Sequence, residues 1–577
     1  MKRAVVSVIL PLIVVSTVAA DAVKVTGIKA EHRNGQTFVT WTDAAEGEAG
    51  ANYRYSLYRA DAPITADTLA KADLLMKGVF NNSAKMFGSA FWPKDRLDPT
   101  KPTARIADGG DTLPLWSGVA VHTVEKDGTS YYAVVATDLK FNALSQVVPG
   151  ESATTEPVEE RVAPIQPIKV YDSKKRGRYW KQTCISGKQG LPLHVSLHAS
   201  SGRGGGAGAW GDYYIYWSPR AWGYREGLPG VFAVQERRSP DRLIVGSRDA
   251  IVAPSGTRAM ETYWFGYYCR PQWADHTDAR AYNFTERRTL WIIDLTIRKY
   301  GADPERVYCS GGSMGAWGSS TFGFRHPEIF AAVYPNRPRT RQRGLPSLAK
   351  RKRGEKVLMF DGKTGYFDRM DMVKFASEHH GDLPFLGWCC GRHDGFATFK
   401  EQIDMVKAMT AAHHGFAFAW NNGNHSSGSR PMGQVTKWYP THLFARNRSY
   451  PAFGNSSIND DLGSGEVEKV VDGKTKRVLD DGDTEGGINL GFAWKNVVDE
   501  ADKWSVVLSN ALCKAPMTVD VTPRRCQAFK PKPGAAFTWT NTASGEGAVT
   551  ADPHGLVTIS KVAIKPGEET TLTIQRK

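Results

Sequence analysis

Cysteine is scarce in this sequence, with seven residues in a chain of 577. That number is too small for a disulfide framework, and no spacing resembles a zinc site, so we expect neither a metal nor another cofactor. Cys513 and Cys526 fall in one candidate β region and could be bridged across strands. The adjacent Cys389 and Cys390 lie in an apolar run and are predicted to be buried thiols.

Long apolar runs are also nearly absent. The one near the start, residues 4–15, follows a basic Met1-Lys-Arg3 and is followed by small residues as far as Ala20. This order is typical of a secretory signal peptide, and the run is too short to span a bilayer comfortably. We therefore expect residues 1–20 to be removed, the protein to be secreted or periplasmic, and no membrane span.

Acidic residues are outnumbered, with 59 Asp and Glu against 74 Lys and Arg, a formal net charge of +15. Such a surface attracts anionic partners, although on an exported protein it is often only a solvated surface. We expect no nucleic-acid partner. The length predicts about three or four domains.

Residues 21–160 alternate apolar and polar side chains in short segments separated by turns, which predicts an antiparallel β-sandwich. The clearest segments are 36–41, 55–58 and 131–134. Together they resemble a fibronectin type III domain with a longer middle insertion. The resemblance implies that this domain acts as a spacer or contacts the substrate and carries no catalytic residues.

Residues 161–450 alternate predicted strands with predicted helices, which favours a mostly parallel sheet with helices on both faces. The chain then passes through an irregular or linker stretch at 451–457. Residues 451–577 contain six alternating segments, beginning with 488–494, and are predicted to be a C-terminal β-sandwich accessory domain.

Gly311-Gly-Ser-Met-Gly315 follows the predicted strand 307–310 and precedes a run suited to a helix. The pattern Gly-x-Ser-x-Gly is typical of a strained turn that projects a nucleophilic serine, here Ser313. The Met314 N–H then points toward an oxyanion formed beside it. A second oxyanion donor is expected from the small-residue loop 199–206, at Ala199 or Ser200.

A nucleophilic serine needs an imidazole base and a carboxylate that orients it. Asp394 and His425 follow two successive predicted strands, 383–391 and 415–420, so both fall at the sheet edge where the serine lies. The competing acids are Asp361, which follows another apolar strand, and the weaker Asp368 and Asp371. The competing histidines are His393, next to the acid, and His413 and His414, which we expect on the surface at a helix end.

The segments 303–315, 325–332, 391–394 and 423–425 together resemble an α/β-hydrolase. The resemblance covers about half the chain and is closest to secreted esterases grouped with polyhydroxyalkanoate depolymerases, feruloyl esterases and acetyl xylan esterases. It implies a serine esterase. One departure is the oxyanion loop, which usually reads His-Gly and here reads His198-Ala-Ser.

Two features bear on the substrate. Aromatic residues are frequent from Trp210 to Trp273. Aromatic faces stack on sugar rings, so some of them could line a cleft, while we expect most to be core or inter-domain residues. A basic loop that contains Arg337 and Arg339 follows the sixth predicted strand, where it could attract an anionic polysaccharide. The predicted substrates are acetyl or feruloyl esters of plant or algal polysaccharides.

Two other functions compete with the esterase. A serine peptidase of the prolyl-oligopeptidase type shares the triad and the turn, but usually carries a β-propeller that the N-terminal region is too short to form. A polysaccharide-binding protein with an inactive hydrolase domain is the second.

Overall fold

A computed structural model describes most of the chain, in two compact units: Met1–Ser83 with Trp116–Ala163, and Ala84–Leu115 with Pro164–Lys577. The described residues are 23–47, 49–84, 105–138, 141–163, 168–171, 188–197, 199, 212–217, 229–236, 241–247, 251–252, 259–260, 264–265, 267–268, 280–341, 358–359, 363–465, 467–471, 473–479 and 481–577.

The first unit consists of two antiparallel sheets, of order β1-β2-β5 and β4-β3-β6-β7. Their strands are β1 (Thr26–Arg33), β2 (Gln36–Thr42), β3 (Arg54–Ala60), β4 (Asp73–Phe80), β5 (Ser117–Thr123), β6 (Gly128–Thr137) and β7 (Val158–Glu160). Val39 and Trp41 of β2 and Val134 of β6 belong to the buried core. The alternating segments thus form strands as predicted, while the fibronectin type III assignment stays a prediction.

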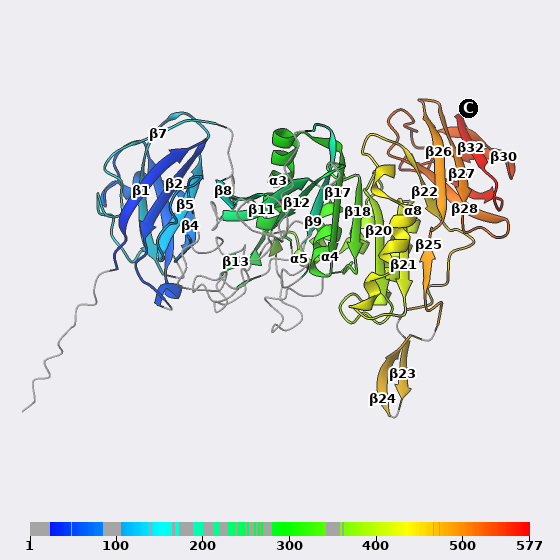
Figure 1. The fold of residues 1–577 in the computed structure, drawn as a ribbon, viewed down its shortest axis with the longest axis horizontal. Helices are drawn as coiled ribbons and strands as arrows, with labels where there is room; N and C mark the ends of the chain where they lie inside the picture. Colours follow the sequence, from blue (N-terminus) through cyan, green and yellow to red (C-terminus); the bar gives the residue numbers. More distant parts are fainter. Residues whose placement is uncertain are drawn as a thin grey trace, which may run out of the picture. The chain divides into compact units, whose positions relative to one another are not determined.

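A ten-stranded sheet organises the second unit, in the order β25-β21-β20-β18-β17-β9-β12-β11-β10-β8 (Figure 1). Its strands are β8 (Ile168–Tyr171), β9 (Leu191–Leu197), β10 (Asp212–Trp217), β11 (Pro229–Glu236), β12 (Leu243–Ser247), β17 (Ala302–Gly312), β18 (Ala332–Asn336), β20 (Phe385–Gly391), β21 (Phe416–Asn421) and β25 (Gly486–Ile488). The strands from β21 to β12 are parallel, and the others pair antiparallel. A large parallel-rich sheet with separate antiparallel sheets fits the predicted α/β-hydrolase with flanking β domains.

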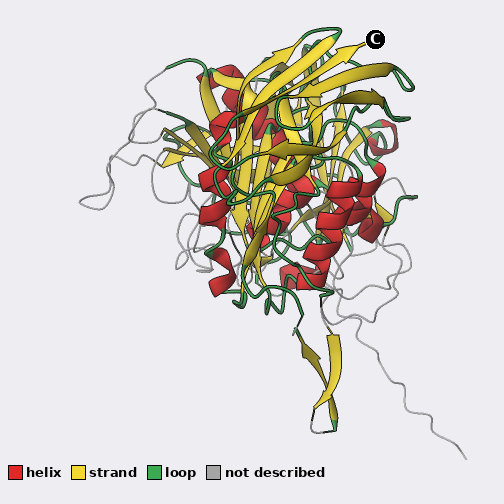
Figure 2. Cartoon of the chain, turned by 90° about the vertical axis from the view of Figure 1, so that its right-hand side faces the viewer, coloured by secondary structure: helices red, strands yellow, loops and turns green. Residues whose placement is uncertain are grey.

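Alternate residues of these strands pack on opposite faces of the sheet, because successive side chains of a strand point in opposite directions. Val307, Cys309 and Trp388 share one buried cluster with residues of α3 (Phe284–Tyr300), α6 (Met372–Glu378) and α7 (Phe399–Ala411). Tyr308 and Phe385 share another with α8 (Met432–Trp438) and with strands of the C-terminal region. Figure 2 shows helices on both sides of the strands. The prediction of helices on both faces therefore holds in part, since C-terminal strands help to cover the second face.

The C-terminal region forms two further antiparallel sheets, of order β22-β28-β31 and β26-β27-β32-β29-β30. Their strands are β22 (Tyr450–Gly454), β26 (Phe492–Asp499), β27 (Lys503–Asn510), β28 (Met517–Arg524), β29 (Ala536–Asn541), β30 (Gly545–Thr550), β31 (Ile559–Ile564) and β32 (Thr570–Arg576).

Two predictions in this region are wrong in part. Of the predicted irregular stretch 451–457, residues 451–454 belong to edge strand β22, and only 455–457 are irregular. Pro451 is accepted in this strand because it lies opposite Pro523, so the two residues that lack an N–H face each other in the register. The predicted strand 488–494 is divided. Its start belongs to β25 of the central sheet and its end to β26, because Asn489 and Gly491 take positive φ values of 56° and 84° and break the strand.

Smaller elements complete the second unit. Two sheets have the orders β13-β14 and β15-β16-β19, and β23 pairs with β24 in a hairpin that projects from this unit in Figures 1 and 2. These strands are β13 (Ile251–Val252), β14 (Ala259–Met260), β15 (Tyr267–Tyr268), β16 (Arg280–Tyr282), β19 (Leu358–Met359), β23 (Val467–Val471) and β24 (Lys474–Val478). Within the described ranges no helix has the length and apolar character to cross a membrane. The predicted signal peptide lies outside them.

Candidate active site

Ser313 lies on the turn between β17 and helix α4 (Met314–Gly318). Its φ of 54° and ψ of −118° place it in a backbone region that a residue with a side chain rarely adopts. The Ser313 N–H donates to the Asn336 carbonyl oxygen at 3.1 Å, which fastens the turn to the end of β18. The predicted strand, turn and helix are all present, and the turn holds the serine in a strained conformation.

Gly311 has no room for a side chain, because the end of β17 and the start of α4 approach each other closely there. A Cβ at Gly311 would lie 2.3 Å from the Gly315 carbonyl oxygen. At Gly312 the nearest atom to an added Cβ would be Arg337 Nη2 at 3.5 Å, which is an ordinary contact. Packing therefore requires glycine at the first of these two positions and not at the second.

We expect Gly311→Ala to lower the free energy of unfolding by about 2 to 3 kcal/mol, since the added methyl group must displace backbone rather than a flexible side chain. The matched change Gly312→Ala should cost less than about 1 kcal/mol. Urea unfolding of both variants provides the comparison. Equal losses would show that the approach of α4 to β17 does not explain the glycine.

A continuous series of hydrogen bonds links three of the predicted residues. Ser313 Oγ lies 2.8 Å from His425 Nε2, and His425 Nδ1 lies 2.7 Å from Asp394 Oδ2. Asp394 Oδ1 accepts hydrogen bonds from the N–H groups of Phe396 at 2.8 Å and Ala397 at 2.9 Å. The Asp394 carboxylate is fully buried, whereas the His425 side chain is 23% exposed. An imidazole whose Nδ1–H donates to a buried carboxylate presents an unprotonated Nε2 to the serine hydroxyl.

The sheet brings these residues together because each follows the carboxyl end of a parallel strand: Ser313 follows β17, Asp394 follows β20 and His425 follows β21. The loop after β20, which carries Asp394 (the acid loop), and the loop after β21, which carries His425 (the base loop), also pack closely against each other. A Cβ at Gly391 would lie 2.3 Å from the Gly423 carbonyl oxygen, and the His393 N–H donates to the same oxygen at 2.9 Å.

Sequence reasoning missed the support that the acid loop receives from beyond residue 450. Arg392 is buried, and its guanidinium donates to the carbonyl oxygens of Asp481 and of Asp483, the latter at 3.1 Å. Trp420 Nε1, near the end of β21, donates to the same Asp483 oxygen at 2.9 Å. No local pattern marks this contact, because the three segments are far apart in the chain.

The competing acids and His393 lie elsewhere or have other partners. Asp371 caps α6 by accepting from the Lys374 N–H at 2.9 Å, and it also faces Arg341. His393 Nε2 is 2.9 Å from Asn422 Oδ1. Asp361 lies outside the described residues, and the strand before it, β19, belongs to a separate sheet.

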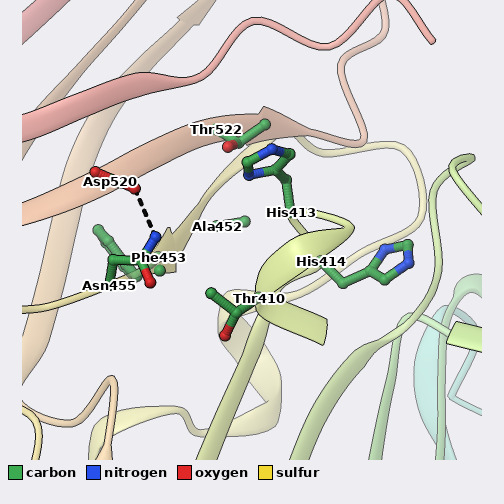
Figure 3. Close-up of a pocket in the computed structure, with 9 residues that line it drawn as sticks. Thr410, His413, His414, Ala452, Phe453, Asn455, Asp520 and Thr522 are labelled. Atoms are coloured by element: carbon green, nitrogen blue, oxygen red, sulfur yellow. Dashed lines mark hydrogen bonds between the residues drawn. The ribbon is translucent and has the colours of Figure 1, made fainter. Parts of the chain in front are cut away.

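His413 and His414 line a pocket between the end of α7 and the strands β22 and β28 (Figure 3). The prediction that both are surface residues is wrong for His414, which is 2% exposed. Its Nε2–H donates to the Ala376 carbonyl oxygen at 3.1 Å. Burial, with the Arg524 guanidinium nearby, lowers the pKa of His414 to about 3. His414 precedes the amino end of β21, whereas His425 follows its carboxyl end, so this weak base lies at the opposite edge of the sheet from Ser313, His425 and Asp394.

The two predicted oxyanion donors are described to different extents. Met314 begins α4, and no described residue accepts a hydrogen bond from its N–H. Ala199 lies two residues beyond Leu197, which pairs with Gly311 in the register of β9 and β17. This brings the start of the small-residue loop next to the serine turn. Ser200 and Trp210 lie outside the described residues.

The basic residues after β18 have different partners. Arg341 Nη1 lies 2.7 Å from Asp404 Oδ2 and its Nε 3.4 Å from Asp371. Arg339 lies over the Trp317 ring at 5.2 Å and donates to the Phe396 carbonyl oxygen. The remaining basic residues of this loop, beyond residue 341, lie outside the described residues.

The predicted buried thiols are confirmed: Cys389 and Cys390 are buried, and burial raises the pKa of Cys389 to about 12. Cys513 and Cys526 are free thiols, so the bridge considered for them is not formed. Cys526 Sγ lies 3.3 Å from Ser449 Oγ.

No protein-family model matches the chain, and no curated protein matches it. Among solved structures, it is similar to the fluorophosphonate-binding serine hydrolase FphF of Staphylococcus aureus, at 10% identity, over 44% of this chain and 84% of that one, with a TM-score of 0.27. A ferulic acid esterase matches at 17% identity over 43% and 86%, with a TM-score of 0.25. A Bacteroides ovatus protein described as a dipeptidyl aminopeptidase IV matches at 12% identity over 72% and 55%, with a TM-score of 0.25. At such TM-scores these likenesses carry no argument about activity, which has to come from the site itself.

Proposed function

We propose that this protein is a serine hydrolase of carboxylic esters, with Ser313 as nucleophile, His425 as base and Asp394 as the orienting acid. The observation that carries the proposal is the hydrogen-bonded series at 2.8 and 2.7 Å, which starts from a serine on a strained turn. A serine hydroxyl is a poor nucleophile until a neutral imidazole accepts its proton, and this geometry supplies that imidazole.

The reaction follows from the positions of the protons. Ser313 Oγ attacks the ester carbonyl carbon while His425 Nε2 takes the hydroxyl proton, and the carbonyl oxygen becomes an oxyanion. His425 then returns the proton to the departing alcohol, which leaves an acyl-enzyme. Water loses a proton to His425 as it attacks the acyl group, and His425 returns that proton to Ser313 Oγ as the carboxylic acid is released.

Two backbone N–H groups are proposed to stabilise the oxyanion. The Met314 N–H follows the nucleophile directly, and the second would come from the stretch at Ala199 and Ser200. The first lacks an acceptor among the described residues, as expected for a group that awaits a developing charge.

The predicted substrates and location remain part of the proposal. We propose acetyl or feruloyl esters of polysaccharides as substrates, because of the aromatic segment 210–273 and the basic loop after β18. We also propose that the protein is exported, because the chain begins with basic residues followed by a short apolar run. The domain boundaries at residues 20, 160 and 450 are likewise proposed.

The first unit has two antiparallel sheets and not the radial blades of a propeller, which favours an esterase over a prolyl-oligopeptidase type of peptidase.

Labelling with a fluorophosphonate tests the proposal directly, because the reagent reacts only with an activated serine. We expect one modified peptide, containing Ser313, in the folded wild-type protein and none in Ser313→Ala. Ser310→Ala, three residues earlier in β17, is the matched control and should still be labelled at Ser313. A folded wild-type protein that takes up no label would end the catalytic hypothesis and leave the binding protein in its place.

A further inference from the structure

Arg337 lies beside the nucleophile because of the register of two neighbouring strands. Gly312 at the end of β17 pairs with Asn336 at the end of β18, and the two strands are parallel. The next residues, Ser313 and Arg337, therefore leave the sheet side by side at the same edge. The guanidinium of Arg337 lies over the serine turn, since its Nη2 would be 3.5 Å from a Cβ added at Gly312.

The backbone of Arg337 is strained and is fixed by a hydrogen bond. Its φ is 64°, in the left-handed region that arginine seldom occupies, and its N–H donates to the Cys389 carbonyl oxygen at 2.9 Å. Strain of this kind persists where the surrounding structure imposes it, and it is concentrated at functional sites.

The charge of Arg337 is not matched by a carboxylate of the described residues. Its Nη1 donates to the Ser426 carbonyl oxygen at 3.3 Å, next to the base His425, and its Nε is buried with no hydrogen-bond partner among the residues that the structure describes. The neighbouring Arg341 differs, because Asp404 and Asp371 neutralise it. Asp394, the acid of the site, is already engaged by His425 and two backbone N–H groups.

We propose that Arg337 is a specificity-determining residue that binds a negatively charged group of the substrate, a carboxylate or a sulfate, close to the reacting ester. This inference rests on the proposed esterase function and narrows its substrate class to esters that carry a negative charge. A guanidinium that has no carboxylate partner and lies in a partly buried site forms strong charge-assisted hydrogen bonds with such a group. The hypothesis of an anionic substrate, first based on the whole basic loop, is thereby reduced to contact with one side chain, that of Arg337.

Two matched pairs of esters test the proposal and tell on which side of the ester the charge lies. The first pair is 4-acetoxybenzoate and its methyl ester, in which the alcohol side is charged or neutral. The second is mono-4-nitrophenyl adipate and its methyl ester, in which the acyl side is charged or neutral. The quantity compared is the ratio of kcat/KM for the charged ester to kcat/KM for the neutral one, which cancels general losses of activity.

We expect Arg337→Asn to lower this ratio about 10- to 100-fold for one of the two pairs, since asparagine accepts the left-handed backbone and removes the charge. Arg337→Lys should recover part of the ratio. Arg341→Asn is the matched control and should leave the ratio unchanged. Unchanged ratios for both pairs in Arg337→Asn would overturn the proposal.

The wild-type protein provides a second measurement that needs no variant to fold. Its ratio for the preferred pair should fall several-fold between about 0.02 and 0.5 M NaCl, because salt screens the attraction. A ratio that does not change with salt would overturn the proposal. Hydrolysis of the neutral esters without any charge preference would reject the Arg337 site alone, whereas no hydrolysis of any ester together with no fluorophosphonate labelling would reject the esterase.

Discussion

Replacing Asp394 by asparagine is expected to lower kcat for ester hydrolysis about 10⁴-fold, the size of effect seen when a triad aspartate becomes an amide. The structure gives the reason. Asp394 Oδ1 accepts from the N–H groups of Phe396 and Ala397, so the amide oxygen of an asparagine keeps that position. Its NH₂ group then faces His425 Nδ1, which must accept a hydrogen bond instead of donating one. The proton moves to Nε2, and the imidazole can no longer take the proton of Ser313.

Steady-state kinetics with a short-chain aryl ester measures this loss, and thermal unfolding shows that the variant is folded. Asp371→Asn is the matched control, because Asp371 caps α6 and faces Arg341. It should keep kcat within about three-fold, as expected of a structural carboxylate outside the triad. Asp361→Asn is measured beside them, and a loss of activity in Asp361→Asn that Asp394→Asn does not share would assign the acid to Asp361.

Replacing Arg524 by methionine is expected to lower the free energy of unfolding by about 3 kcal/mol, since it removes a buried cation that several acceptors depend on. Arg524 ends β28, in the C-terminal region, and is 2% exposed. Its guanidinium donates to the Gly381 carbonyl oxygen, and its Nε lies 3.2 Å from Asp382 Oδ1. Both partners belong to the loop between α6 and β20, so this one side chain joins the C-terminal sheets to the central sheet.

Lys495→Met is the matched control, because Lys495 forms an ion pair with Glu569 in which both side chains are 55% exposed. An exposed pair of this kind contributes less than about 1 kcal/mol. Urea unfolding followed by circular dichroism measures both variants. Similar losses in the two would mean that the contact made by Arg524 does not couple the C-terminal region to the central sheet.

The C-terminal region was predicted to be an accessory domain, and the structure ties it closely to the site. Asn489 is fully buried, and its Nδ2 donates to the carbonyl oxygens of Phe416 in β21 and Phe453 in β22. The strand β25 extends the central sheet beside β21, and the Asp483 carbonyl oxygen supports Arg392 in the acid loop. Removing the chain after residue 450 would therefore expose part of one face of the central sheet and remove the Asp481 and Asp483 acceptors from the loop of Asp394.

Local sequence was sufficient for the elements and residues whose chemistry is local. Period-two alternation marked several of the strands, such as β2, β3 and β6, because this pattern reflects burial on one side of a single element. The Gly-x-Ser-x-Gly turn predicted a strand, a strained serine and a helix. The placement of Asp394 and His425 after successive strands predicted their meeting, since parallel strands end at one edge.

Only the tertiary structure decided which segments come together across long distances in the chain. Arg524 Nη2 lies 3.5 Å from His414 Nδ1, more than a hundred residues earlier in the chain, and Pro451 is accepted in a strand because Pro523 lies opposite. Arg337 differs from the other basic residues of its loop because β17 and β18 end in register, with Gly312 opposite Asn336 just before Ser313 and Arg337, and because Asp404 neutralises Arg341. The sequence alone determined the serine turn and the chain order of Ser313, Asp394 and His425, the proposed nucleophile, acid and base, because these features depend on neighbours in the chain. The charge beside the nucleophile and the role of the C-terminal strands depend on neighbours in space, which no local pattern encodes.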